Sequence, residues 1–187
     1  PFFKTDIPTV SQDLGAALFE TTLKMTASAG LGAYEISNHS RPGYECRHNL
    51  TYWKGGDYIG IGPGAHSRLS DSMVFTAAHQ IYNPVRWLNT VEEIGHGTGK
   101  RQQLNSRDKA EEMIMTGLRL TRGLDTSAIA VKTGLELTDL VNRSALTRFL
   151  KESLLEKKGR NLMATPAGWM VLNTLIGELL SETDVPS

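Results

Sequence analysis

The sequence lacks the features that mark secreted, membrane-spanning and nucleic-acid-binding proteins. Cys46 is the single cysteine among 187 residues, so the chain forms no internal disulfide and cannot by itself supply the several thiolates of an iron–sulfur cluster. No apolar run approaches the roughly 20 residues of a membrane span. Acidic and basic residues number 20 each, so no net charge attracts nucleic acid or an acidic membrane surface. These absences predict a reducing, cytoplasmic location without a transmembrane segment.

What the chain does contain is an ordinary globular composition. Hydrophobic residues make up 40% and charged residues 21%, far from the signature of a disordered chain. The length suits one domain or two small ones. The chain opens at Pro1 without an initiator methionine, which leads us to expect a piece of a longer protein, with trimming as the alternative.

The first part of the chain predicts α/β units. A helix is expected over residues 12–29, capped by Ser11 and stopped by Gly30. Its apolar face would carry Leu14, Leu18 and Met25. Short strands are expected over residues 33–37 and 58–61, with polar loops between them. Such loops commonly carry functional sites.

From Pro84 to Ser153 the pattern becomes helical, and no strong strand is expected. One helix would begin at a Ser106 cap and end near Gly123, and shorter helices would follow at 126–133 and 139–152.

The last part of the chain predicts a hairpin and a final helix. Strands over residues 154–156 and 162–164 would flank a turn, and Thr165 would cap a helix with Pro166 at its first position. The buried stripe of this helix would be Trp169, Leu172, Ile176 and Leu179. Helices, a hairpin and a helix resemble a winged-helix module. We place the boundary between the two parts near residues 96–106, where several glycines suggest flexibility.

The richest chemical motif runs from Cys46 to Trp53, in a segment expected to be a loop between two strands. His48, Asn49, Tyr52 and Trp53 bring together a metal-binding imidazole, an amide and two aromatic rings. Such groups suit a flat apolar cofactor, because imidazole is a common haem ligand and aromatic rings border macrocycles. On chemistry alone, a structural role for these rings remains the favoured alternative.

A second motif is the glycine-rich turn directly after the second expected strand. Gly60, Gly62 and Gly64 would let backbone amides approach a ligand closely. The spacing also fits a dinucleotide fingerprint, but no acidic residue follows about 20 positions later, so we reject that site. A plain tight turn is the alternative.

Three weaker possibilities remain. Cys46, His39, His48 and His66 do not have the paired spacing of a structural zinc site. Glu35 has no evident partner to adapt it as a general acid or base, and a solvated or hydrogen-bonded carboxylate is the simpler interpretation. The basic segment 157–160 would suit nucleic acid, yet three charges on a neutral chain are typical of a solvated turn.

Three segments together resemble the HemW family of haem chaperones, proteins related to oxygen-independent coproporphyrinogen III oxidase. They are Tyr34–Asn38, Cys46–Trp53 and Gly60–His66. Residues 115–120 are in addition similar to the start of the C-terminal domain that HemW shares with that oxidase.

The resemblance implies the C-terminal part of a partial TIM-like radical-SAM barrel over residues 1–100. A helical C-terminal domain with a β-hairpin wing would occupy residues 101–187. It further implies that His48, Asn49, Tyr52 and Trp53 hold haem and that Gly60, Gly62 and Gly64 lie near S-adenosylmethionine (SAM). The 4Fe-4S cluster would belong to an N-terminal half of the barrel that this chain lacks.

By this resemblance the parent protein binds haem and delivers it to haem-acceptor proteins. The alternative is the oxidase activity itself, the oxidative decarboxylation of coproporphyrinogen III. The chain alone would carry out no radical chemistry, and we expect it to bind no nucleic acid.

Overall fold

The computed structural model describes residues 10–181, which divide into two compact units at Glu45 and Cys46. The first unit contains helix α1 (Gln12–Ser28) and a short antiparallel pair of strands, β1 (Gly32–Ala33) and β2 (His39–Ser40). As predicted, Ser11 caps α1, and its hydroxyl accepts a hydrogen bond from the Leu14 amide at 3.2 Å. The predicted helix is therefore confirmed.

One expectation for this unit is wrong, and one property of α1 did not follow from the sequence. The strand predicted over residues 33–37 does not form, because the chain reverses there and the Tyr34 amide bonds to the Asn38 carbonyl at 3.1 Å. The property concerns the predicted apolar face of α1: α1 has no buried residue, and Leu14, Leu18 and Met25 are exposed.

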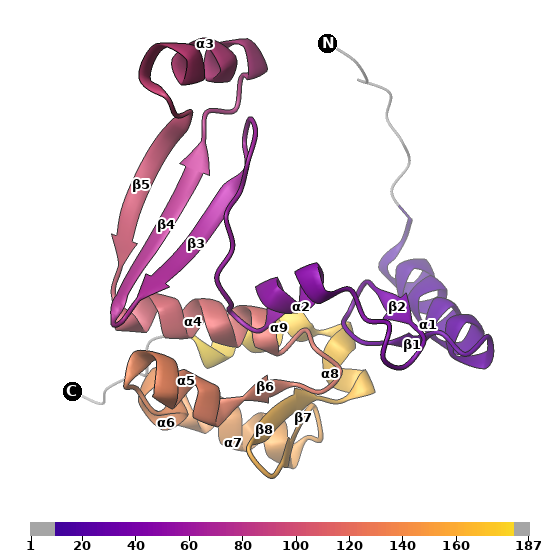
Figure 1. The fold of residues 1–187 in the computed structure, drawn as a ribbon. Coiled ribbons are helices and arrows are strands. Elements are labelled where there is room, and N and C mark those ends of the chain that lie inside the picture. Colours follow the sequence, from indigo (N-terminus) through magenta and orange to yellow (C-terminus); the bar gives the residue numbers. More distant parts are fainter. Residues whose placement is uncertain (1–9, 182–187) are drawn as a thin grey trace. The chain divides into compact units, whose positions relative to one another are not determined.

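The second unit begins with helix α2 (Arg47–Trp53), where we expected a loop. An antiparallel sheet follows, with strands β3 (His66–Asp71), β4 (Val74–Gln80) and β5 (Thr98–Leu104) in the order β3-β4-β5. Helix α3 (Pro84–Ile94) connects β4 to β5 and lies beyond one end of the sheet (Figure 1).

The sequence misled us about this sheet for a physical reason. Both of its faces are largely solvated, so its strands show little of the alternation of apolar and polar residues by which a strand is predicted. The strand predicted over residues 58–61 is reduced to one isolated bridge between Tyr58 and Arg68. The glycine segment 95–99 is not a loose linker, because Gly97 is buried against the indole of Trp87 and β5 starts at Thr98.

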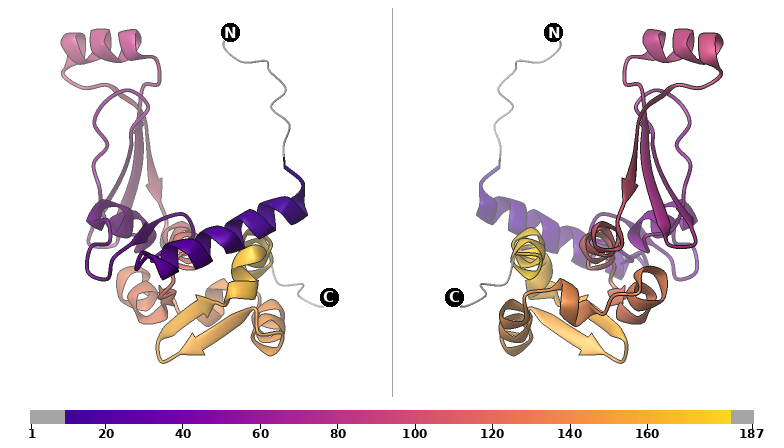
Figure 2. Two further views of the ribbon diagram at one scale, coloured as in Figure 1. Left: turned by 90° about the vertical axis from the view of Figure 1, so that its right-hand side faces the viewer. Right: turned by 90° about the vertical axis from the view of Figure 1, so that its left-hand side faces the viewer.

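Helices and a second sheet complete the unit. The strands are β6 (Leu124–Asp125), β7 (Leu155–Lys158) and β8 (Asn161–Ala164), all antiparallel, in the order β6-β8-β7. The helices are α4 (Ser106–Gly117), α5 (Thr126–Thr133), α6 (Leu137–Leu140), α7 (Arg143–Lys151), α8 (Pro166–Met170) and α9 (Leu172–Leu179). In Figure 2, α4 lies at one end of the β3-β4-β5 sheet, and α3 lies at the other end.

The C-terminal expectations are largely confirmed. The hairpin β7–β8 forms, Thr165 caps a helix that begins at Pro166, and the predicted apolar stripe is buried. The final helix is, however, divided at Val171 into α8 and α9. Helix α4 is capped by Asn105 and not by Ser106. Strands β5 and β6 both lie within residues 84–153, where no strong strand was expected.

The hydrophobic core lies in the second unit. Among the described residues, every buried apolar side chain belongs to residue 75 or later, and the best covered include Ile114, Leu118, Ile129, Leu162 and Leu179. The mixed α/β class is thus confirmed. The predicted division near residue 100 stays a prediction. No described helix is long and apolar enough to cross a membrane.

Candidate functional site

Helix α2 carries the predicted haem-binding residues on consecutive turns. His48 and Tyr52 are four residues apart and therefore share one face of the helix. The imidazole Nε2 of His48 lies 2.7 Å from the Tyr52 hydroxyl, and the two rings meet edge to face with centroids 4.5 Å apart. Tyr58 continues this cluster, because its ring lies 4.3 Å from that of Tyr52 and nearly perpendicular to it.

The four predicted residues differ in their exposure. His48 is exposed, whereas Asn49, Tyr52 and Trp53 are half-buried. The indole Nε1 of Trp53 is buried, and it has no hydrogen-bond partner among the described residues. A buried donor without a partner costs free energy of about 1–3 kcal/mol, so this nitrogen is suited to a ligand acceptor. The site is thus open at His48 and carries an unused donor at Trp53.

The turn after α2 anchors the helix to α4. Gly55 has a φ of 63°, in the left-handed region, and a Cβ at this position would lie 2.6 Å from Cγ of Met113. Only glycine fits both the backbone conformation and the close approach. The Gly55 carbonyl also accepts a hydrogen bond from Lys132 Nζ at 2.9 Å, which ties this turn to α5.

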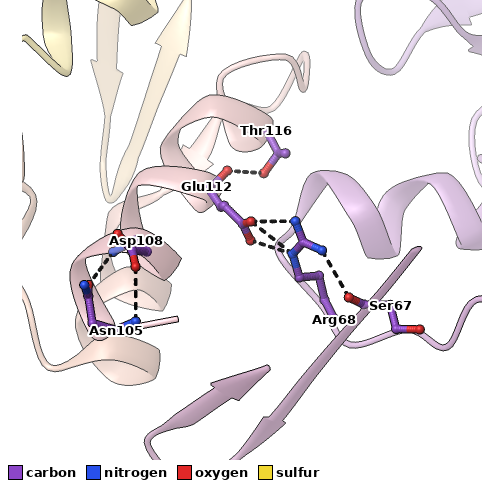
Figure 3. A network of polar contacts seen from close by, with 6 residues as sticks. All are labelled: Ser67, Arg68, Asn105, Asp108, Glu112 and Thr116. Atoms are coloured by element: carbon purple, nitrogen blue, oxygen red, sulfur yellow. Dashed lines mark hydrogen bonds and ion pairs between the residues drawn. The ribbon is translucent and has the colours of Figure 1, made fainter. Parts of the chain in front are cut away.

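An ion pair holds the neighbouring sheet to α4 (Figure 3). The Arg68 guanidinium donates to both carboxylate oxygens of Glu112, with Nε at 3.0 and 3.1 Å and Nη2 at 2.8 Å from Oε1. This bond to Glu112 raises the pKa of Arg68 above its ordinary value. Arg68 also pairs with Tyr58 through backbone bonds of 2.8 and 2.9 Å, and burial raises the pKa of the Tyr58 phenol. The aromatic cluster on α2 is therefore continuous with the sheet.

Asp57 fixes the loop between α2 and the sheet. Its carboxylate accepts hydrogen bonds from the Ser70 hydroxyl at 2.7 Å and the Ser70 amide at 2.9 Å, and Lys132 Nζ lies 3.2 Å away. Burial acts to raise the pKa of Asp57, but the bonds from Ser70 and Lys132 outweigh it and lower the pKa below its ordinary value.

The glycine turn has a conformational explanation without any ligand. Gly62 and Gly64 have φ values of 101° and 71°, which other residues rarely adopt. A side chain on Gly60 would overlap the backbone of His66. The positive φ values and the close backbone approach are both typical of a tight turn. The predicted proximity of these glycines to SAM stays a prediction.

The weaker candidates are resolved as follows. Glu35 is fully buried, and the Asn38 amide donates to one of its oxygens while the other has no partner among the described residues, so it is not solvated. His39 bonds to Thr26 at 3.0 Å within the first unit. In the described range, no three His, Cys, Asp or Glu side chains gather as they would around a metal ion. At the hairpin tip, Lys158 pairs with Glu156 at 2.9 Å.

Sequence reasoning missed two features. The first is the Arg68–Glu112 pair, whose members are 44 residues apart and give no local signal. The second is Lys109, which is 2% exposed and whose pKa is lowered mainly by burial. A lysine in the middle of a helical pattern is normally assigned to the solvent face, so the pattern hides this burial.

Comparison with known proteins agrees with this architecture. The family model for the HemN C-terminal domain matches residues 104–171. In the solved structure of E. coli coproporphyrinogen III oxidase (HemN), described as a radical SAM enzyme, 42% of the chain superposes on 91% of this one. The TM-score is 0.67 at 16% sequence identity, so this likeness establishes a shared fold. By fold, the chain corresponds to a part of the HemN structure.

Curated relatives define the family more closely. Radical S-adenosyl methionine domain-containing protein 1 of Bos taurus, named as mitochondrial, is 33% identical over 181 residues, which are 94% of this chain and 41% of that protein. The haem chaperone HemW of Bacillus subtilis is 28% identical over 172 residues, 91% of this chain and 44% of that protein. The chain belongs to this HemW-like family. It spans about two fifths of the length of these relatives.

Proposed function

We propose that this protein binds haem and passes it to haem-requiring acceptor proteins. The observation that carries the proposal is the exposed His48 imidazole, held by Tyr52 on α2, together with the unused indole donor of Trp53 in the same helix. Relatives that carry the name haem chaperone support the same function.

The residues of α2 suit a porphyrin chemically. If the imidazole donates its Nε2 proton to the Tyr52 oxygen, the lone pair lies on Nδ1 and can bind iron, with Tyr52 orienting the ring. The indole N–H of Trp53 can donate to a carboxylate, and the Tyr52 and Trp53 rings offer apolar surface. Asn49 would add a polar contact. Because His48 is exposed, haem can also leave the site, which delivery to an acceptor requires.

Haem titration followed by Soret absorbance tests the proposal. We expect saturable binding by the protein, weakened roughly tenfold or more in His48→Ala and Trp53→Ala, since one loses the iron ligand and the other a donor and an apolar contact. Tyr52→Phe should change the Soret maximum more than the affinity. His96→Ala, an exposed histidine outside α2, is the matched control. Wild-type affinity in both His48→Ala and Trp53→Ala would refute the assignment.

The second candidate is oxidative decarboxylation of coproporphyrinogen III, favoured by the HemN C-terminal domain and the fold shared with the oxidase. Radical SAM chemistry requires a cluster held by several thiolates, and the lone, exposed Cys46 does not fit that role. We therefore derive no radical step from these residues. Anaerobic conversion of coproporphyrinogen by the reconstituted protein would favour the oxidase, and haem binding without conversion would favour the chaperone.

The division into domains, the cofactors and the location are parts of the same proposal. Residues 1–100 would supply part of a radical-SAM barrel with the turn at Gly60, Gly62 and Gly64 near SAM, and 101–187 a helical, winged-helix-like domain. The range matched by the C-terminal domain model, which starts at residue 104, supports this division. Haem, SAM and a 4Fe-4S cluster would be the cofactors of the whole protein. We propose a cytoplasmic location, although relatives named as mitochondrial would fit an organelle, and no nucleic-acid partner.

A further inference from the structure

The sheet carries a pair of histidines that the haem site does not use. His66 on β3 and His79 on β4 are directly opposite each other in the antiparallel register, and Lys100 on β5 is opposite His79. Residues opposite each other in a sheet share a face. The two imidazole centroids are 5.8 Å apart, and the Tyr82 ring lies beside both, at 5.5 Å from His79 and 6.5 Å from His66.

The free nitrogen of His79 can be identified from its hydrogen bond. Its Nδ1 lies 3.2 Å from the carbonyl oxygen of Gln80. A carbonyl only accepts, so Nδ1 carries the proton and the lone pair is on Nε2. Metal-binding histidines are commonly oriented by such a bond from the second ring nitrogen to a backbone carbonyl. His66 makes no hydrogen bond through its ring to any described residue, so its ring is also available.

The spacing of the two rings fits chelation. A borderline transition metal about 2.1 Å from one nitrogen of each ring separates the two centroids by roughly 5–6.5 Å, depending on the ligand angle. The observed 5.8 Å lies within this range. His66 is exposed and His79 half-buried, so an ion has access from solvent.

The backbone around the pair is held in place before any ion binds. The Gln80 amide bonds to the Ala65 carbonyl at 2.8 Å, and the Gly64 amide bonds to the Ile81 carbonyl at 3.0 Å. These bonds connect the residues next to both histidines. The Trp87 indole, which donates to the Gln80 side chain at 3.1 Å, supports the same end of β4.

We propose that His66 and His79 chelate a non-haem divalent transition metal ion, with water in the remaining coordination positions. Zn²⁺ and its first-row neighbours accept imidazole readily. Haem iron does not suit this pair, because its two open positions lie on opposite faces of the porphyrin, whereas neighbouring strands offer two ligands from one side. The proposal is independent of the haem function assigned to α2.

Isothermal titration with Zn²⁺ is the first test. We expect one ion per chain, with the affinity reduced at least about tenfold in His66→Gln and in His79→Gln, since each leaves a single imidazole. Lys100→Gln should tighten binding about threefold, because it removes a positive charge from the same face. This variant changes an exposed strand residue and keeps the test decisive if a histidine variant folds poorly.

Histidine side-chain NMR with Zn²⁺ identifies the ligands. The Nε2 resonance of His79 and one ring nitrogen of His66 should shift with the first equivalent, while His79 Nδ1 stays protonated. His48→Ala and His96→Gln should bind Zn²⁺ as the wild type does, so a failed haem assignment leaves this result intact. Absence of Zn²⁺ binding, unchanged affinity in both histidine variants, or first shifts at His39, His48 or His96 would overturn the proposal.

Discussion

At the scale of single residues, the Arg68–Glu112 pair makes the sharpest stability prediction. Glu112→Gln should lower the free energy of unfolding by about 1–3 kcal/mol, because it leaves a half-buried guanidinium without its carboxylate. Urea unfolding followed by circular dichroism measures the change.

The neighbouring residue provides the control for this prediction. Glu111 pairs with Arg107 one turn away on α4, and its side chain is as exposed as that of Glu112, but Arg107 is 54% exposed whereas Arg68 is 24% exposed. Glu111→Gln should therefore cost less than about 0.5 kcal/mol. Equal losses in the two variants would mean that Arg68 does not depend on Glu112.

Asp57 should make stability depend on acid pH. Its folded pKa lies below the ordinary value of 3.8, so the unfolded chain binds a proton more readily than the folded one. The stabilisation is fully present above the unfolded pKa and is lost as the pH falls through the folded value. Asp57→Asn should therefore destabilise the protein near neutral pH, and its difference from wild type should shrink as the pH falls below 3.8.

Urea titrations of Asp57→Asn and wild type, near neutral pH and in acid, test this prediction. Ser70→Ala, which removes the hydroxyl donor and keeps the backbone amide, should show a smaller effect of the same sign. A difference between Asp57→Asn and wild type that persists unchanged in acid would rule out the role assigned to the Ser70 and Lys132 contacts.

At the scale of elements, two glycines of the C-terminal helices should respond in opposite directions to alanine. A Cβ at Gly168 in α8 would overlap the Leu154 carbonyl, whereas one at Gly177 in α9 would meet nothing within 4 Å. Gly168→Ala should thus cost at least about 2 kcal/mol through displaced backbone. Gly177→Ala should stabilise by about 0.5–1 kcal/mol through helix propensity and lower unfolded-state entropy. Thermal unfolding compares them directly, and a stabilised Gly168→Ala would contradict the packing of α8 on the hairpin.

The same elements show how far sequence patterns reach. Caps, turn glycines and apolar stripes are local, and they predicted α1, α5, the β7–β8 hairpin and the buried stripe of α8 and α9. Strands β3 to β5 escaped prediction because their faces are solvated. Helix α2 escaped because its apolar and polar residues are mixed over only seven positions.

At the scale of the whole molecule, stability should reside in the second unit. All described buried apolar side chains lie at residue 75 or beyond, and α1 buries none. A chain of residues 46–187 should therefore unfold cooperatively, with a free energy within about 1 kcal/mol of the full chain. Denaturant unfolding of the two chains makes the comparison. A collapse of cooperativity in the shorter chain would show that residues 1–45 contribute to the core.

The sequence by itself determined the composition class, the local elements with clear caps, the family resemblance and the choice of the α2 residues as candidate haem ligands. Composition, caps and short motifs can all be read along the chain without knowing which distant residues meet. Only the tertiary structure decided which distant side chains meet. Glu112 with Arg68, His66 with His79 and the burial of Lys109 depend on strand register and helix packing over long separations, and no local periodicity encodes those contacts. For the same reason, only the structure showed that His48, a candidate ligand group from the sequence, is exposed and that the buried Trp53 indole nitrogen has no partner among the described residues.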